Sequence, residues 1–130
     1  MFARLLRVVY SFVFMGAKGA RATASDQILT PEQAWVKIKS GALLLDCRSP
    51  SECSTGVLPG ALTIPHNEVG ARIVEFGTDP TREVVVYCAV GGRASLAKEV
   101  LHRSGFENVF NAGGYSALEA YGADHGLIGS

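Results

Sequence analysis

Residues 84–95 read VVVYCAVGGRAS and contain the transition on which the fold depends. Four β-forming residues lead into Cys88, two glycines and an arginine follow, and an alanine-rich stretch then begins. A short apolar run of this kind is typical of a buried strand. The sequence ASLAKEVLHRSG at 94–105 is typical of a helix that ends before a glycine. The stretch therefore predicts a strand over 83–88, a short loop and a helix.

Further strands and helices are predicted on both sides of this unit. Short apolar runs predict strands at 42–46, 62–65 and 108–110. Helical spacing and capping signals predict helices at 30–40, 67–77 and 115–122, and composition predicts a loop at 49–61. This alternation indicates an α/β domain with a mostly parallel central sheet of about four to five short strands flanked by helices. Ligands of such sheets lie beyond the carboxyl ends of the strands, where Cys88 is expected.

The composition is that of one globular domain. The chain has 130 residues, of which 48% are hydrophobic and 18% charged. The formal net charge is zero, so nothing overall indicates nucleic-acid binding. Up to Ser25 there are four basic residues and no acidic one, which leaves eight basic against twelve acidic residues in the rest of the chain. An anionic substrate would therefore have to be attracted by a local feature.

The first 24 residues differ in composition from the remainder. A basic MFARLLR is followed by the apolar run VVYSFVFMGA and by the small residues of ARATAS. This order predicts a secretory signal peptide over 1–24, cleaved after Ala22-Thr23-Ala24, and a folded domain over 25–130. The apolar run is shorter than the about 20 residues of a membrane span, so none is expected after processing. We expect a periplasmic or secreted protein, with a mitochondrial transit peptide or a membrane anchor as alternatives.

Cys88 is the candidate nucleophile. Gly91 and Gly92 permit positive φ and a sharp turn, so successive loop N–H groups can form an anion-binding nest at the start of the next helix. A thiol at the mouth of such a nest has a lowered pKa and attacks as a thiolate at neutral pH. Arg93 would add a positive charge. A buried cysteine before an ordinary glycine turn is the alternative.

Four blocks of the sequence resemble the rhodanese family. CAVGGRA resembles its active-site loop, Cys-x-x-Gly-x-Arg followed by a small residue. LLLDCRSPSEC resembles its Asp-x-Arg-x-x-x-Glu signature, with Asp46, Arg48 and Glu52 at the three positions. GVLPGALTIP and NVFNAGGYSAL resemble two further blocks, and all four occur in the order of the family within 30–121. The chain is similar to the small exported single-domain rhodaneses.

The resemblance implies a rhodanese-like domain with thiosulfate sulfurtransferase-like activity and ping-pong kinetics. Cys88 would take the outer sulfur of a small anionic donor such as thiosulfate and pass it from a persulfide to cyanide or a thiol. The substrate-binding loop would hold the persulfide and the anionic part of the donor through its backbone; its residues are Ala89, Val90, Gly91, Gly92 and Arg93. No metal, organic cofactor or nucleic acid is implied, and the oligomeric state is left open.

Two other functions are weighed against this one. The related phosphatases and arsenate reductases have five residues between cysteine and arginine, whereas four lie between Cys88 and Arg93. The tighter loop suits a sulfur atom better than a phosphate. A non-catalytic binding module is the other alternative. Inactive members of the family tend to lose the cysteine, whereas this chain keeps both Cys88 and Arg93. The family often has a histidine where Val57 stands and a tryptophan near Tyr115 and Leu118. These departures weaken the assignment to a subfamily more than they weaken the expected activity.

The remaining polar candidates are expected to have structural roles. Asp46 and Arg48 should tie the adjacent loop down by charge-assisted hydrogen bonds, with Glu52 as further support. His66 is expected at the surface. The three cysteines have no metal-ligand spacing, and we expect Cys47 to be buried and not linked to Cys53. A disulfide between them, or their use in resolving a Cys88 persulfide, is the less favoured hypothesis.

Overall fold

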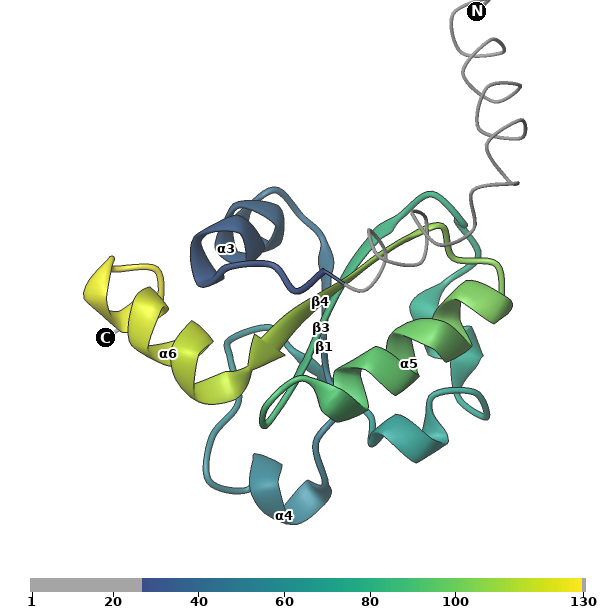
Figure 1. The fold of residues 1–130 in the computed structure, drawn as a ribbon, viewed down its shortest axis with the longest axis horizontal. Coiled ribbons are helices and arrows are strands. Elements are labelled where there is room, and N and C mark those ends of the chain that lie inside the picture. Colours follow the sequence, from purple (N-terminus) through teal and green to yellow (C-terminus); the bar gives the residue numbers. More distant parts are fainter. Residues whose placement is uncertain (1–26, 130) are drawn as a thin grey trace, which may run out of the picture.

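The computed structural model describes residues 27–129, so the predicted signal peptide over 1–24 lies outside the described residues. The elements are α3 (Pro31–Lys39), β1 (Leu43–Asp46), α4 (Pro50–Cys53), β2 (Leu62–Thr63), the 3-10 helices η2 (His66–Glu68) and η3 (Ile73–Phe76), β3 (Glu83–Cys88), α5 (Gly92–Arg103), β4 (Asn108–Gly114) and α6 (Tyr115–Asp124) (Figure 1). Within this part of the chain, no helix has the length and apolar character needed to cross a membrane.

The four strands form one parallel sheet in the order β2-β1-β3-β4. The predicted α/β fold with a short parallel sheet is therefore confirmed, and β3 is a central strand. Its neighbour β1 is paired so that Asp46 lies opposite Tyr87. At the outer edge of β4, Ile28 adds an isolated parallel bridge to Asn111.

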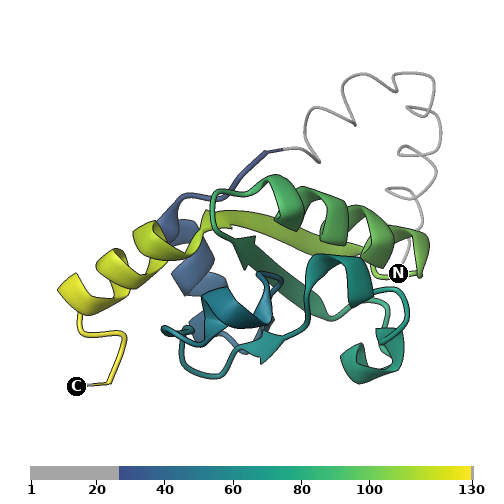
Figure 2. The ribbon, with the colours of Figure 1, turned by 90° about the horizontal axis from the view of Figure 1, so that it is seen from below.

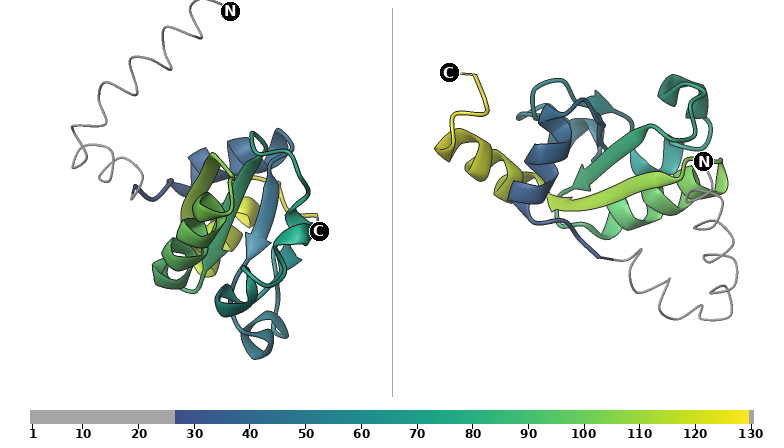
Figure 3. Two further views of the ribbon diagram at one scale, coloured as in Figure 1. Left: turned by 90° about the vertical axis from the view of Figure 1, so that its right-hand side faces the viewer. Right: turned by 90° about the horizontal axis from the view of Figure 1, so that it is seen from above.

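Helices cover both faces of the sheet. Figures 1 and 3 show α5 on one side and α3 with α6 on the other, while Figure 2 shows β4 joining α5 to α6. Each face has its own apolar core, because the side chains of a strand alternate between the two faces. On the α3 side, the Trp35 indole donates a hydrogen bond to the Leu118 carbonyl oxygen at 2.9 Å, which joins α3 to α6. The sheet is thus buried on both faces, which explains its apolar strands.

The predicted helix over 30–40 is confirmed by its first turn. The hydroxyl of Thr30 accepts a hydrogen bond from the Gln33 amide, and the Gln33 side chain accepts one from the Thr30 amide. This reciprocal pair is a capping box, and Pro31 occupies the first helical position. Gly41 follows the end of the helix with φ at 104°.

The predicted helix over 67–77 is wrong. The segment forms the two short 3-10 helices, separated by turns, although Val69 and Phe76 are buried as their spacing suggested. Neither 3-10 helix has a side-chain cap, and Gly70 lies between them, where it weakens a continuous helix by about 1 kcal/mol relative to alanine. Two short turns can bury the same apolar residues as one helix.

Three other boundaries differ from the predictions. The predicted loop at 49–61 contains α4, whose Ser49 and Glu52 form a second capping box. The last strand continues beyond 110 to Gly114, which pairs with Cys88 after a register shift. The strand predicted at 62–65 is shorter, since Pro65 has no N–H for the ladder.

Candidate active site

Cys88 is the last residue of β3 and lies at the carboxyl edge of the parallel sheet. The chain then turns into α5 within three residues. Gly91 enables the turn: its φ is 108°, and a Cβ there would lie 3.4 Å from the Ile28 side chain. Gly92 is the first residue of α5, and a Cβ on it would meet nothing within 4 Å. Of the two glycines expected to supply positive φ, only Gly91 therefore does so.

The loop directs its amides at the cysteine sulfur. Cys88 Sγ accepts hydrogen bonds from the Gly91 amide at 3.0 Å and from the Ala94 amide at 3.4 Å. The pKa of Cys88 is lowered to about 4 by a hydrogen bond with the Cys47 side chain and, against the effect of burial, by the amides of Ala94, Gly91 and Val90. Hydrogen bonds to the charged form favour that form, so this cysteine is a thiolate at neutral pH.

The rim of this loop is apolar and open to solvent. Val90 is 84% exposed and Ala89 is also exposed, whereas Cys88 itself is fully buried beneath them.

Asn111 supports the loop from β4, a role that the sequence analysis missed. Its side-chain amide donates to the Gly91 carbonyl oxygen at 2.9 Å, and its side-chain oxygen accepts from the Gly113 amide at 2.8 Å. Gly114 also permits the approach, because a Cβ there would collide with the Ala89 carbonyl oxygen. The block NVFNAGGYSAL was quoted only for its resemblance to the family, whereas the structure shows that its buried Asn111 links the end of β4 to the loop after β3.

Arg93 does not present a free charge to the thiol. Its guanidinium donates to both carboxylate oxygens of Glu52, at 2.7 and 2.9 Å, and so joins α5 to α4. The hydrogen bonds from Arg93 and Ser49 hold the pKa of the Glu52 carboxyl well below its usual range. The expected cation beside Cys88 is therefore paired with Glu52, while the backbone amides of Gly91 and Ala94 donate hydrogen bonds to the sulfur.

Asp46 and Arg48 form a buried pair at the end of β1. The Arg48 guanidinium donates to Asp46 at 2.7 Å and to the Gly56 carbonyl oxygen, also at 2.7 Å. It lies over the Tyr115 ring, 4.2 Å from the centroid. Burial opposes ionisation of Asp46, but the hydrogen bonds from Arg48 prevail and lower its pKa. These contacts tie the segment after β1 to the sheet, which is the geometry that a structural role requires.

The other two cysteines lie in different surroundings. Cys47 is fully buried, as predicted, and lies on β1's extension beside Cys88, while Cys53 is half-buried on α4. All three thiols are free. His66 is partly exposed, and its backbone amide donates to the Cys47 carbonyl oxygen at 3.0 Å. Among the candidates outside the loop, Cys47 has the largest effect on the pKa of Cys88.

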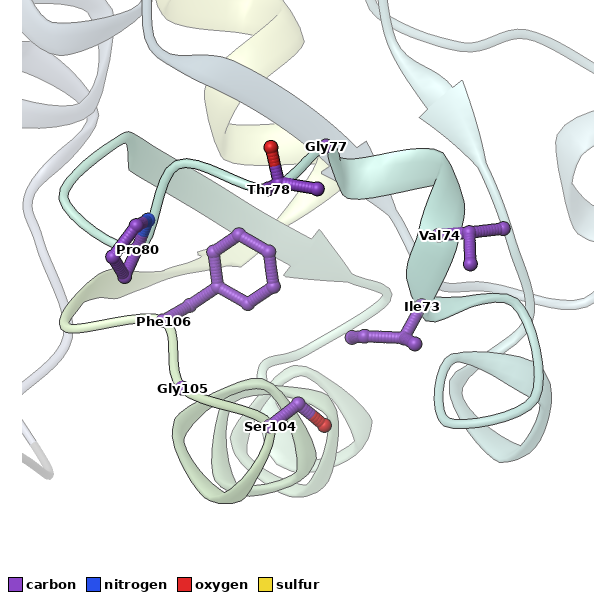
Figure 4. A pocket seen from close by; sticks show the side chains of 8 residues that line it. All are labelled: Ile73, Val74, Gly77, Thr78, Pro80, Ser104, Gly105 and Phe106. Carbon is purple, nitrogen blue, oxygen red and sulfur yellow. The ribbon is translucent and has the colours of Figure 1, made fainter.

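A pocket of about 380 Å³ lies elsewhere, at the amino end of β3. Figure 4 shows the Phe106 ring and the Ile73 side chain lining it, between η3 and the end of α5. The loop over Cys88 is at the opposite edge of the sheet and contributes none of its lining residues. The pocket is therefore separate from the candidate active site.

The fold is that of the rhodanese-like domain family. That family matches residues 30–121, so the chain belongs to it, and the resemblance seen in the four sequence blocks is confirmed. A sulfurtransferase of Allochromatium vinosum is 37% identical over 81 residues, which cover 62% of this chain and 74% of that protein. The thiosulfate sulfurtransferase PspE of Escherichia coli is 39% identical over 70 residues, which cover 54% of this chain and 67% of that protein.

Solved structures show the same fold. A rhodanese with anions from E. coli superposes with a TM-score of 0.56 at 35% identity, covering 59% of this chain and 91% of that one. A protein of unknown function from Rhodopseudomonas palustris CGA009, described as a possible tyrosine phosphatase, has a TM-score of 0.67 at 28% identity and covers 79% of this chain and 86% of that one.

Proposed function

We propose that the protein is a sulfurtransferase that carries a sulfane sulfur on Cys88 as a persulfide. The observation that carries the proposal is the thiolate site: Cys88 Sγ accepts hydrogen bonds from the amides of Gly91 and Ala94 at the end of a central strand. Membership of the rhodanese-like family and two relatives named as sulfurtransferases support the same activity.

In the first half-reaction, the Cys88 thiolate attacks the outer sulfur of a donor such as thiosulfate. The bond between Sγ and the outer sulfur forms, the S–S bond of the donor breaks, and sulfite leaves with the electron pair. The thiolate needs no separate base, because the low pKa of Cys88 leaves it deprotonated at neutral pH. The new terminal sulfur is anionic and is stabilised by the N–H groups of the loop.

In the second half-reaction, a thiophilic acceptor attacks the terminal sulfur of the persulfide. Cyanide would leave as thiocyanate and a thiolate would leave as a new persulfide, and in both cases Cys88 departs as its thiolate. The donor and the acceptor react in turn with one cysteine, so the kinetics are ping-pong.

The charges around the loop indicate how the donor is held. Arg93 is paired with Glu52 and Arg48 with Asp46. The anionic part of the donor would therefore bind to the backbone amides of the loop more than to a guanidinium, as anions do at nests and helix N-termini.

Phosphoryl transfer is the second candidate, because one solved structure of this fold is described as a possible tyrosine phosphatase. Four residues separate Cys88 from Arg93 here, one fewer than in the related phosphatases. In this shorter loop the Gly91 amide already lies 3.0 Å from the sulfur. That closeness favours a single sulfur atom over a tetrahedral phosphate.

The test is an intact-mass measurement after incubation with thiosulfate. The wild type and Cys53→Ser should each gain one sulfur atom, and Cys88→Ser should gain none. Addition of cyanide should return the mass to its initial value and release thiocyanate. A gain that survives Cys88→Ser, or no gain in the wild type, would overturn the proposal. Hydrolysis of p-nitrophenyl phosphate that disappears in Cys88→Ser would instead support a phosphatase.

We also propose that residues 1–24 are a cleaved export signal, so that the enzyme works in the periplasm or outside the cell. The support is the order of a basic, an apolar and a small-residue segment in the sequence. The mass of the protein purified from its native host tests this. Loss of residues 1–24 supports it, and a mass that includes Met1 contradicts it; a mitochondrial location would indicate a transit peptide instead.

A further inference from the structure

Cys47 and Cys88 are neighbours across the two central strands. Asp46 on β1 lies opposite Tyr87 on β3, so the residues that follow them, Cys47 and Cys88, are also placed side by side. The Cys47 amide donates to the Tyr87 carbonyl oxygen at 3.0 Å, which continues the ladder beyond the end of β1. Because side chains alternate along strands, both cysteines point to the α5 face, where they belong to the same buried core.

The two sulfurs face different environments within this pair. Both cysteines are fully buried, but Cys88 Sγ accepts hydrogen bonds from the Gly91 and Ala94 amides of the loop, whereas Cys47 lies on the neighbouring strand. The charged groups that act on the pair are Asp46, next to Cys47, and Arg93 on α5. The hydrogen bond with Cys88 and burial raise the pKa of Cys47, so this thiol keeps its proton when Cys88 has lost its own.

We infer that Cys47 is a positioning residue whose protonated thiol donates a hydrogen bond to Cys88 Sγ. It completes a set of donors around that sulfur, with the Gly91 and Ala94 amides on the loop side. The deprotonated Cys88 is thereby stabilised in the resting site. If the proposed sulfur transfer holds, the same hydrogen bond stabilises Cys88 as the leaving thiolate of the second half-reaction. Cys47 keeps its proton throughout, and no redox step is involved.

This role is distinct from that of a resolving cysteine. To form a disulfide with Cys88, Cys47 would have to attack as a thiolate, and its burial next to another thiolate disfavours that form. The inference therefore predicts that no Cys47–Cys88 disulfide accumulates during turnover.

The experiment follows the alkylation of Cys88 by iodoacetamide as a function of pH, in a Cys53→Ser background. Cys47→Val removes the donor at similar volume, Cys47→Ala removes it with a cavity, and Cys47→Ser supplies an O–H donor. We expect Cys47→Val and Cys47→Ala to move the midpoint of the pH profile of Cys88 alkylation upward by at least about one pH unit. Well below that midpoint, the rate should fall about tenfold for each unit. Serine should restore most of the wild-type profile.

Several outcomes would overturn the inference. The first is an alkylation profile that is unchanged in Cys47→Val and Cys47→Ala. The second is a profile of Cys47→Ser that shifts as far as that of Cys47→Ala. The third is a Cys47–Cys88 disulfide in thiosulfate-treated protein. Alanine and valine pack differently at position 47. If one of these two variants fails to fold, the other can still be compared with Cys47→Ser. Alkylation requires no sulfur donor, so this result is independent of the proposed function: a shifted profile in a protein that gains no sulfur would refute only the sulfurtransferase.

Discussion

Glu52 and Arg93 lie 41 residues apart in the chain and form a two-pronged ion pair with N–O distances of 2.7 and 2.9 Å. The pair connects α4 to the first turn of α5, directly after the loop over Cys88. Both side chains are about one third exposed. Because Arg93 is paired with Glu52, it is not a free charge beside Cys88.

The first prediction concerns acid sensitivity. The pKa of Glu52 is lowered by its hydrogen bonds with Arg93 and Ser49, so its contribution to stability is present above the ordinary value of 4.5 and is lost as the pH falls below it. The free energy of unfolding of Glu52→Gln should therefore be lower than that of the wild type at pH 7 and approach it towards pH 2. Urea unfolding at several pH values measures this difference. Glu99→Gln, which removes an exposed carboxylate 3.9 Å from Arg103, is the control and should show a much smaller pH-dependent difference.

The second prediction compares two adjacent glycines. Gly91→Ala should destabilise the protein by more than about 1 kcal/mol, because its φ of 108° disfavours any side chain and a Cβ would press on Ile28. Gly92→Ala should be neutral or stabilising by up to about 1 kcal/mol, since it begins α5 and has open space around its Cα. Denaturant midpoints measure both. Equal losses in the two variants would contradict this account of the loop.

Features whose interacting residues are close together in the sequence could be predicted, and features whose residues are far apart in the sequence could not. The strand at 83–88 and the turn that follows it are contiguous, so an apolar run and a glycine turn were sufficient to predict them. Cys88 as the nucleophile remains a prediction, for which the resemblance of four separate sequence blocks was also needed. The partner of Arg93 was not identified, because it depends on where α4 packs against α5. The spacing of Val69 and Phe76 was misinterpreted as a helix, since 3-10 turns can bury the same residues.

Asn111 was missed for the same reason. Its contact with Gly91 exists only because β4 pairs with β3, and a single asparagine in a short strand carries no local signal. Cys47 was noticed as a buried cysteine, but its place beside Cys88 follows from the register of β1 and β3. Strand register of this kind is set by the whole fold, not by neighbouring residues in the sequence.

The third prediction tests the support that Asn111 gives to the loop. Asn111→Ala would leave the Gly91 carbonyl and the Gly113 amide without their side-chain partner in a buried place, which should cost about 1–3 kcal/mol. The loop would also be held less firmly, so the alkylation of Cys88 should change together with stability. Asn108→Ala on the same strand is the control, because its hydrogen bond to the Thr81 carbonyl is exposed. If Asn108→Ala lost as much stability as Asn111→Ala, the buried contact of Asn111 would contribute no more than an exposed hydrogen bond.

The fourth prediction is that iodoacetamide distinguishes the three cysteines of the folded protein. At pH 6 the thiolate of Cys88 predominates, because its pKa is lowered to about 4 by the Cys47 side chain and the loop amides. Burial raises the pKa of Cys53, and the hydrogen bond with Cys88 and burial raise that of Cys47, so both remain thiols. Peptide mass mapping after brief labelling should therefore find the label on Cys88 alone, at a rate that is constant above about pH 6 and falls tenfold per unit below about pH 4. Guanidinium-unfolded protein is the control, in which all three should react at similar rates because the hydrogen bonds are gone. Preferential labelling of Cys53 in the folded protein would mean that exposure, and not the stabilised thiolate, decides reactivity at this site.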